Sequence, residues 1–434
     1  LPDLRLVHDH GVHAHHRVAP DAAAVQHRAV ANMARGLHDH PEVREGVDDA
    51  GLLHIGTGAE TNWYQKNVHE PLLKNFLRYL QSGENHVDEL VILGDWFDLW
   101  NYHPFSSPPD VALIMRQNPA LFQRHADGDF VSLLDTVKVR YINGDHDMEV
   151  ELREVNRLLS DVTDRRILPG HGSDLEKPAL ANTYYMDGPV WAEHGNQHDL
   201  FNKPSLTEAN PLAPLPLGYF VTRIYCHYLQ KKIASVHRAD AAAVAGCCET
   251  GLENYGISLE GLLQELLLQL KKGEKLNPAG IILKMMMQHN RNNQLEFKLG
   301  SKSLSEVNTD GIARFYPDLI SEENFYDAMC EAEVAFDGLA HFARQHVQKN
   351  PHTRVVVMGH THCALNMYCG SLKNHLFVNT GYFCPPQPDI DSGLHLPGFV
   401  EVDSFKDGSL KVTQKIVSGT LDEDIREISA LRVY

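Results

Sequence analysis

The sequence predicts an α/β fold built in layers, with a mainly helical insertion between two parts of its core. Short apolar runs typical of buried strands alternate with segments whose apolar residues recur at helical spacing. Three of these runs are each followed by a short motif rich in Gly, Asp and His. Because ligand sites of α/β proteins form in loops at the carboxyl ends of strands, these motifs predict a functional site at the edge of a sheet.

The length of 434 residues favours two or more structural units. We expect a His-rich N-terminal arm over residues 1–50, a first part of the core over 51–205, a helical insertion or cap over 206–350 and a second part of the core over 351–434. The arm holds eight histidines and little strand-like pattern, so we expect it to be loosely attached or poorly ordered. Its end, residues 46–51, makes a poor buried strand.

The first part of the core contains two predicted helices and three strand-like runs. Pro71 is expected in the first turn of a helix whose apolar stripe extends from Leu72 to Leu80. A second helix is expected over residues 148–159. The strand-like runs are residues 90–93, 137–142 and 189–192.

The insertion and the second part of the core have different patterns. Helical stretches of the insertion carry Leu, Met and Phe stripes, which favour a packed core over a ligand pocket; they are residues 257–272, 279–287 and 323–348. Strand-like runs return at residues 354–358 and 376–381. Two more runs around the turn Asp407-Gly408 predict a closing hairpin over residues 398–417.

Composition argues against several classes of function. The formal net charge of −18 disfavours a large non-specific nucleic-acid surface, because phosphate binding needs clustered Lys and Arg. The seven cysteines are odd in number and irregularly spaced, which favours a reducing, cytoplasmic compartment over a disulfide framework. No stretch approaches the roughly 18 apolar residues of a transmembrane segment, although peripheral contact with a membrane stays open.

Four separated motifs carry the residue types of a two-metal site. They are Gly94-Asp95-Trp96-Phe97-Asp98, Gly144-Asp145-His146-Asp147, His194-Gly195-Asn196-Gln197-His198-Asp199 and Gly359-His360-Thr361-His362. Hydrolysis of a phosphate ester needs a strong nucleophile and cations that absorb charge on the phosphoryl oxygens, and two divalent ions about 3.5–4 Å apart supply both. Mixed imidazole and carboxylate ligands suit Mn, Fe or Zn.

These motifs resemble those of the calcineurin-like metallophosphoesterase family, which reads Asp-x-His, Gly-Asp-x-x-Asp, Gly-Asn-His-Asp/Glu, an isolated His and Gly-His-x-His. The resemblance covers about residues 52–200 and 353–417 and is nearest to the bacterial UDP-2,3-diacylglucosamine pyrophosphatase-like branch, with Asn379-Thr380-Gly381 after the last motif. It implies a layered αββα sandwich. It also implies hydrolysis of a small or lipid-linked phosphate ester or pyrophosphate by a metal-activated hydroxide at a dinuclear site.

The resemblance further implies roles for single ligands. Asp95 resembles the carboxylate that bridges the two divalent metal ions. His194 and His360 resemble ligands of the second ion, and His362 resembles a ligand of the first. His54, in the segment that resembles the first motif, matches the histidine of that motif.

The second motif supplies the candidate for proton transfer. His146 occupies the position of a histidine that is not a ligand, and that donates to the phosphate or protonates the leaving oxygen. Asp98 matches the acid that orients this histidine. Asp145 stands where the family has Asn, and its added charge should tighten metal binding while weakening attraction for an anionic phosphate. Asp199 receives no definite role.

The first motif departs from the family pattern, because Leu52 stands two residues before His54 and cannot bind metal. Three explanations are open: Asp48 or Asp49 is recruited by a shifted backbone, the first metal site is weak or lost, or the first 50 residues replace the usual strand. Two other functions also stay open. One is a nuclease of the same fold, and the other is a catalytically weakened, metal-binding interaction protein.

Overall fold

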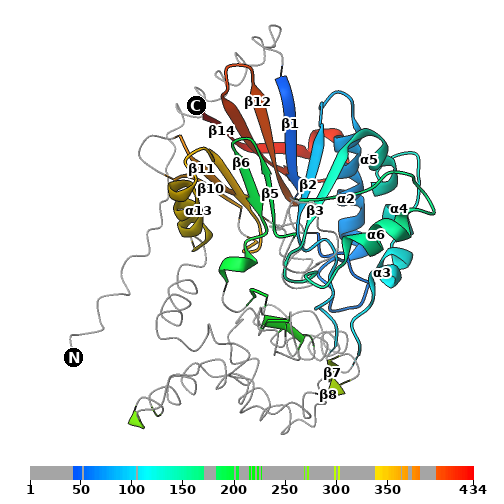
Figure 1. Ribbon diagram of the computed structural model, residues 1–434. Coiled ribbons are helices and arrows are strands. Elements are labelled where there is room, and N and C mark those ends of the chain that lie inside the picture. The colour runs from blue at the N-terminus through cyan, green and yellow to red at the C-terminus, as the bar shows by residue number, and fades with distance from the viewer. Residues whose placement is uncertain are drawn as a thin grey trace, which may run out of the picture.

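The computed structural model describes residues 53–103, 106–170, 182–199, 338–362, 364–369, 374–381 and 397–434, the backbone of residues 43–50, and a few short pieces between residues 202 and 303. These parts form a mixed α/β structure, as the sequence predicts (Figure 1). The Leu- and Met-rich stretches of the predicted insertion, and most of the predicted arm, lie outside the described residues.

The larger sheet has seven strands and a mixed pairing pattern. Its order is β14 (Ile425–Val433), β13 (Leu410–Val417), β12 (Gly398–Phe405), β1 (Val43–Ala50), β2 (Glu89–Leu93), β3 (Lys138–Ile142) and β4 (Leu168–Pro169). Strands β1 to β4 are parallel to one another, and β12 to β14 pair antiparallel. The predicted closing hairpin is confirmed as β12 and β13, whose turn contains Gly408 with a positive φ of 81°.

The smaller sheet has five strands. Its order is β10 (Leu365–Tyr368), β11 (Leu376–Asn379), β9 (Val355–Met358), β6 (Val190–Glu193) and β5 (Tyr184–Asp187). The three inner strands are parallel, and each edge strand pairs antiparallel with its neighbour. A separate pair of two-residue strands consists of β7 (Lys298–Leu299) and β8 (Lys302–Ser303).

Helices cover the outer faces of the two sheets (Figure 1). The larger sheet packs against α2 (Lys66–Gln81), α3 (Val111–Gln117), α4 (Pro119–Phe122), α5 (Phe130–Thr136) and α6 (Leu152–Leu159). The smaller sheet packs against α13 (Gly338–Lys349). Two short 3-10 turns, η1 (Asn196–His198) and η7 (Asp422–Asp424), complete the described elements.

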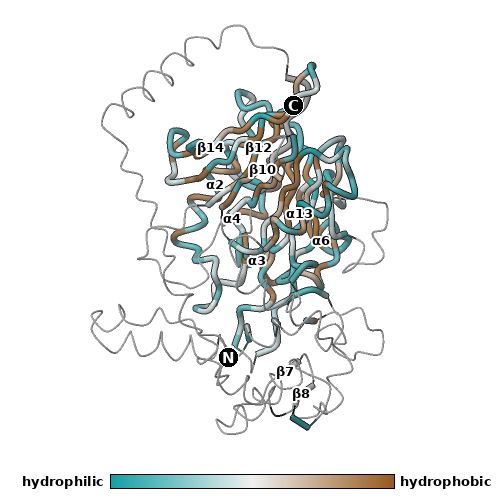
Figure 2. The backbone as a smooth tube through the Cα atoms, turned by 90° about the vertical axis from the view of Figure 1, so that its left-hand side faces the viewer, coloured by the Kyte–Doolittle hydropathy of each residue, from teal (hydrophilic) through white to brown (hydrophobic). Residues whose placement is uncertain are grey.

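Strand β2 shows why the elements stack in this way, because successive side chains of a strand point to opposite faces. Leu90 and Ile92 lie in the apolar cluster beneath the helices of the larger sheet. Val91 and Leu93 lie in a second cluster between the two sheets. All five residues of β2 are buried, and the apolar strands run through the middle of the molecule in Figure 2. None of the described helices combines the length and apolar character that a membrane crossing requires.

Strand β1 corrects the predicted boundary of the N-terminal arm. It occupies Val43–Ala50, which the sequence assigns to the arm, and it lies inside the larger sheet. It pairs antiparallel with β12 and parallel with β2, so backbone hydrogen bonds along both edges define it despite its acidic residues. Residues 43–50 therefore belong to the larger sheet and not to a separate arm.

Helix α13 corrects the boundary at the other end of the insertion. The sequence places residues 338–349 in the insertion, but Leu339, Ala343 and Val347 pack against Val356 and Phe377 of the smaller sheet. Leu339 and Val347, which contribute to the amphipathic pattern of residues 323–348, thus help to cover a sheet of the core.

Helix α2 begins one turn earlier than predicted, at Lys66, so Pro71 lies inside the helix. The turn that precedes Pro71 is held by two bonds to the carbonyl of Gln65, from the amides of Val68 and His69. The imidazole Nδ1 of His69 also accepts from the amide of Gln65 at 2.7 Å. These bonds stabilise residues 66–70, which would lie outside a helix that began at Pro71.

Candidate metal centre

The predicted site residues come together at the carboxyl ends of four parallel strands. Asp95 follows β2 and Asp145 follows β3 in the larger sheet, while His194 follows β6 and His360 follows β9 in the smaller sheet. The two sheets therefore bring motifs that are far apart in the sequence to one edge of the fold.

The backbone at this edge adopts conformations that non-glycine residues rarely take. Positive φ angles occur at His54 (47°), Asp95 (49°), His360 (62°) and His362 (60°), all of which are predicted site residues. Such conformations cost of order 1–3 kcal/mol each and concentrate at functional sites. The observation therefore supports a functional role for this edge independently of the residue types.

Glycine allows two motif loops to approach each other closely. A Cβ atom on Gly144 would lie 2.2 Å from Oδ1 of Asp95, and a Cβ on Gly94 would lie 2.5 Å from the amide nitrogen of Gly144. The amide of His146 donates to Oδ1 of Asp95 at 2.9 Å across this contact. Side chains at either glycine would separate the loops and move Asp95.

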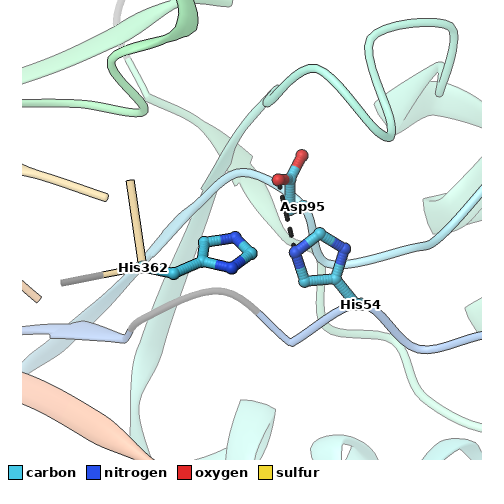
Figure 3. A group of neighbouring side chains, drawn as sticks. All are labelled: His54, Asp95 and His362. Carbon is cyan, nitrogen blue, oxygen red and sulfur yellow. Dashed lines mark ion pairs between the residues drawn. The ribbon is translucent and has the colours of Figure 1, made fainter. Parts of the chain in front are cut away.

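We define the first cluster as His54, Asp95 and His362, whose side chains converge in Figure 3. Nε2 of His54 lies 3.5 Å from Oδ2 of Asp95. His54 is fully buried, yet neither ring nitrogen has a hydrogen-bond partner in the described part of the chain. The loop of His54 is fixed to the motif that follows β2. The amide of His54 donates to the carbonyl of Asp95, and the amide of Ile55 donates to the carbonyl of Trp96.

We define the second cluster as Asp145, His194 and His360. Oδ1 of Asp145 lies 2.8 Å from Nε2 of His194 and 3.1 Å from Nδ1 of His360. Nε2 of His360 lies 3.0 Å from Oδ2 of Asp199, which holds this ring from the other side. Each of the two clusters gathers its donor atoms within 4.8 Å of one another.

Asp95 reaches both clusters with one oxygen atom. Its Oδ2 lies 3.5 Å from Nε2 of His54 and 3.3 Å from Nε2 of His194. The side chain is 1% exposed, so water does not screen the carboxylate. This is the position that a carboxylate shared by two cations requires.

The predicted catalytic pair also meets in the structure. Nδ1 of His146 lies 3.2 Å from Oδ1 of Asp98, and the other nitrogen, Nε2, lies 4.0 Å from Oδ2 of Asp145. Asp98 is itself held by the amides of Trp100 and Asn101, each at 3.0 Å. The indole of Trp100 stacks on the His146 ring at a centroid distance of 4.6 Å. Asp98 and Trp100 thus orient His146 with Nε2 toward the clusters.

Burial sets the protonation of the first cluster. It lowers the pKa of His54 and of His362 well below the ordinary value, and neighbouring histidines add to this effect. Burial also raises the pKa of Asp95 well above its ordinary value, and the adjacent Asp145 and Asp147 act in the same direction. The two imidazoles are therefore neutral, which is the form that binds metal.

Charge pairing outweighs burial in the second cluster. Burial alone would raise the pKa of Asp145, but His360 and His194 hold it well below its ordinary value. Burial would likewise lower the pKa of His360, but Asp145 and Asp199 raise it well above. The positive charge on His360 balances the carboxylates of Asp145 and Asp199. A bound cation would take over this role.

The orientation of His194 fits a metal ligand. Nδ1 lies 2.6 Å from the carbonyl oxygen of Leu93, and a carbonyl only accepts, so Nδ1 carries the proton. Nε2 then faces carboxylate oxygens of Asp145 and Asp95. A cation bound among these atoms would take the lone pair of Nε2 in place of a proton. The ring nitrogens of His54 have no hydrogen-bond partner in the part of the chain that the structure describes, so they are free to bind an ion. The mixed imidazole and carboxylate donors of the two clusters also suit divalent ions.

Three residues to which the sequence analysis assigned no role support the site. Asp199 orients His360, and it lies within the predicted third motif. Asp147 accepts from the amides of Trp96 and Gly144 and so joins two motif loops. The side-chain nitrogen Nδ2 of Asn379 donates to the carbonyl of Gly359 at 2.6 Å and fixes the last motif. Leu52, Asp48 and Asp49, on which the open question about the first motif depends, lie outside the described side chains.

No family model matches the chain, and no curated protein matches it. The case for a function therefore depends on the arrangement of the residues and on their chemistry.

Proposed function

We propose that the protein is a metal-dependent hydrolase of a phosphate ester or pyrophosphate, with a dinuclear site bridged by Asp95. The observation that carries the proposal is the shared oxygen: Oδ2 of Asp95 faces Nε2 of His54 in the first cluster and Nε2 of His194 in the second. The stacking of helices, two sheets and a further helix also supports the αββα sandwich that the motif resemblance implies.

The site residues divide into ligands and a proton donor. His54, His362 and Asp95 would hold one ion, and the second cluster with Asp95 would hold the other. When bound, two such ions supply a nucleophilic hydroxide and absorb charge on the phosphoryl oxygens. His146 would give its Nε2 proton to the leaving oxygen, while Asp98 accepts from Nδ1 and orients the ring.

The proposal is tested by removing and restoring metal. The purified chain is stripped with a chelator, reloaded with Mn²⁺ and assayed on a phosphate monoester, a phosphate diester, a pyrophosphate diester and single-stranded DNA. We expect Mn²⁺-dependent turnover of at least one small ester, which Asp95→Asn abolishes. The matched control Asp135→Asn removes a surface carboxylate that pairs with Arg124 and should leave turnover unchanged.

Each result has a clear meaning. Turnover that persists in Asp95→Asn would contradict the proposal. Two tightly held ions without turnover of any ester would favour the interaction protein, and cleavage of DNA alone would favour the nuclease.

A further inference from the structure

Trp63 contacts three imidazoles of the site. Its ring centroid lies 4.4 Å from that of His54, 4.9 Å from that of His146 and 5.2 Å from that of His362. Two of these rings belong to the first cluster, and the third is the proposed proton donor. None of the roles assigned above uses Trp63.

The loop before Trp63 is fixed by hydrogen bonds rather than left loose. Oδ1 of Asn62 accepts from the amides of Gly58 and Ala59, and Nδ2 of Asn62 donates to the carbonyl of Asn101 at 3.0 Å. Asn101 in turn is bound to Asp98, the partner of His146. The loop that carries Trp63 is therefore connected by hydrogen bonds to Asp98, the residue that orients His146.

Trp63 differs from the other indole beside His146. Trp100 is 1% exposed and stacks on His146 from within the core. Trp63 packs on the same core but is only partly buried, as is His362 beside it. In the described part of the chain, Trp63 is thus the indole at His146 that keeps a surface available to a ligand.

This placement bears on the leaving group of the substrate. A residue that protonates the leaving oxygen must contact it, so the atoms attached to that oxygen lie beside the His146 ring. We propose that Trp63 binds the leaving group through its ring face, and that the site prefers substrates whose leaving group contains a planar ring. The inference rests on the proposed function, because it takes His146 as the proton donor. Aromatic rings favour offset-stacked or edge-to-face contacts with other rings, whereas an alkyl chain gains only apolar contact.

A substrate and variant cycle tests the inference. Phenyl phosphate and hexyl phosphate are compared with the Mn²⁺-loaded full chain, and kcat/KM is measured for the wild type, Trp63→Leu and Trp63→Phe. We expect Trp63→Leu to lower kcat/KM about tenfold for the phenyl ester and less than about threefold for the hexyl ester, where tenfold corresponds to about 1.4 kcal/mol. Trp63→Phe keeps a ring and should stay within about threefold of the wild type for both esters.

Trp96→Phe is the matched control. The indole Nε1 of Trp96, like that of Trp63, is buried and has no hydrogen-bond partner among the described residues. The ring of Trp96, however, packs against Phe97, Phe130 and Tyr141. We expect Trp96→Phe to leave the ratio of the two esters unchanged. Metal content and thermal unfolding of each variant confirm that the clusters are intact.

The outcomes separate the inference from the function on which it rests. Equal losses for both esters in Trp63→Leu, or no loss for either, would overturn the inference while leaving the hydrolase proposal in place. Failure of the metal-loaded wild type to hydrolyse any ester at all, in this comparison and in the wider screen, would overturn the proposed function itself.

Discussion

The two clusters at the edge of the sheets are built differently. In the second cluster every side chain is tied to another protein group: His194 to the carbonyl of Leu93, and His360 to Asp199. In the first cluster His54 has no hydrogen-bond partner among the described residues, and Trp63 covers its ring. The rings of His194 and His360 are therefore held by hydrogen bonds before any ion binds, whereas the ring of His54 is held among the described residues by burial and by packing against Trp63.

The clusters also differ in charge. The second cluster has a carboxylate of its own, Asp145, in addition to the shared Asp95. Among its described residues the first cluster has only the shared carboxylate, because its other members, His54 and His362, are neutral. Since a cation is held more tightly by more anionic ligands, we expect the second cluster to fill first.

The largest effect is expected from Asp95→Asn, which removes the carboxylate that both clusters share. Turnover should fall by at least about a thousandfold, equivalent to about 4 kcal/mol, because both ions are weakened together. Elemental analysis should show loss of metal from both positions. Loss of one ion with the other fully retained would break the claim that Asp95 is shared.

His146→Gln separates proton transfer from metal binding. We expect kcat to fall about 10²- to 10⁴-fold, because the leaving oxygen loses its proton donor. Metal content should stay the same at both clusters, and the surface variant His125→Gln should have normal kcat. Release of metal by His146→Gln would show that His146 is a ligand, and that the division between clusters and proton donor is wrong.

The pair His54→Asn and His194→Asn sharpens the comparison between the clusters. Each variant should weaken the binding of one ion, His194→Asn the tighter of the two and His54→Asn the weaker. Each affinity should fall by more than the roughly 10- to 100-fold that loss of a residue supporting a ligand costs. Calorimetric titration with Mn²⁺ measures both affinities in each variant. If the two variants lose the same ion, the donors belong to one site.

Leu52→Asp asks whether the first cluster lacks a ligand. If the sequence register relative to His54 is that of the resembling family, the new carboxylate should raise the affinity of the weaker ion by about tenfold. The control Leu53→Asp places the charge one residue later, at a buried core position, and should not raise it. Unchanged affinity in Leu52→Asp would place residue 52 away from the cluster.

A smaller effect concerns acid stability away from both clusters. Burial lowers the pKa of His69 from 6.5 to about 4. Between pH 6.5 and about 4, His69 is protonated in the unfolded chain but stays neutral in the folded chain. The free energy of unfolding therefore falls as the pH drops through this range. His69→Gln should flatten this slope in urea unfolding of the chelated protein, whereas the exposed His125→Gln should not. An unchanged slope in His69→Gln would place the acid sensitivity elsewhere.

The sequence predicted the strands before the motifs because each is a short apolar run, buried on both faces as in β2. It missed β1 because Asp48 and Asp49 break the apolar pattern that is typical of a buried strand. The strand forms through pairing with β12, which is distant in the sequence. It assigned α13 to the insertion because an amphipathic pattern does not reveal which surface covers it.

In the candidate site, too, local sequence predicted some residues, whereas others depend on contacts between distant segments. Motif residues such as Asp95 and His360 could be selected from local sequence, because their types and spacing carry the chemistry. Asp199 and Trp63 could not, because their importance arises from contacts that folding alone creates. Asp199 meets His360 across 161 positions of the chain.

The central claim is that one carboxylate oxygen is shared by two cations. Low-temperature electron paramagnetic resonance of the Mn²⁺-loaded chain tests it most directly, because two ions about 3.5–4 Å apart couple magnetically. We predict two ions per chain and an exchange-coupled signal that Asp95→Asn abolishes. A single uncoupled Mn²⁺ signal at saturating metal, or a coupled signal that survives in Asp95→Asn, would contradict the account.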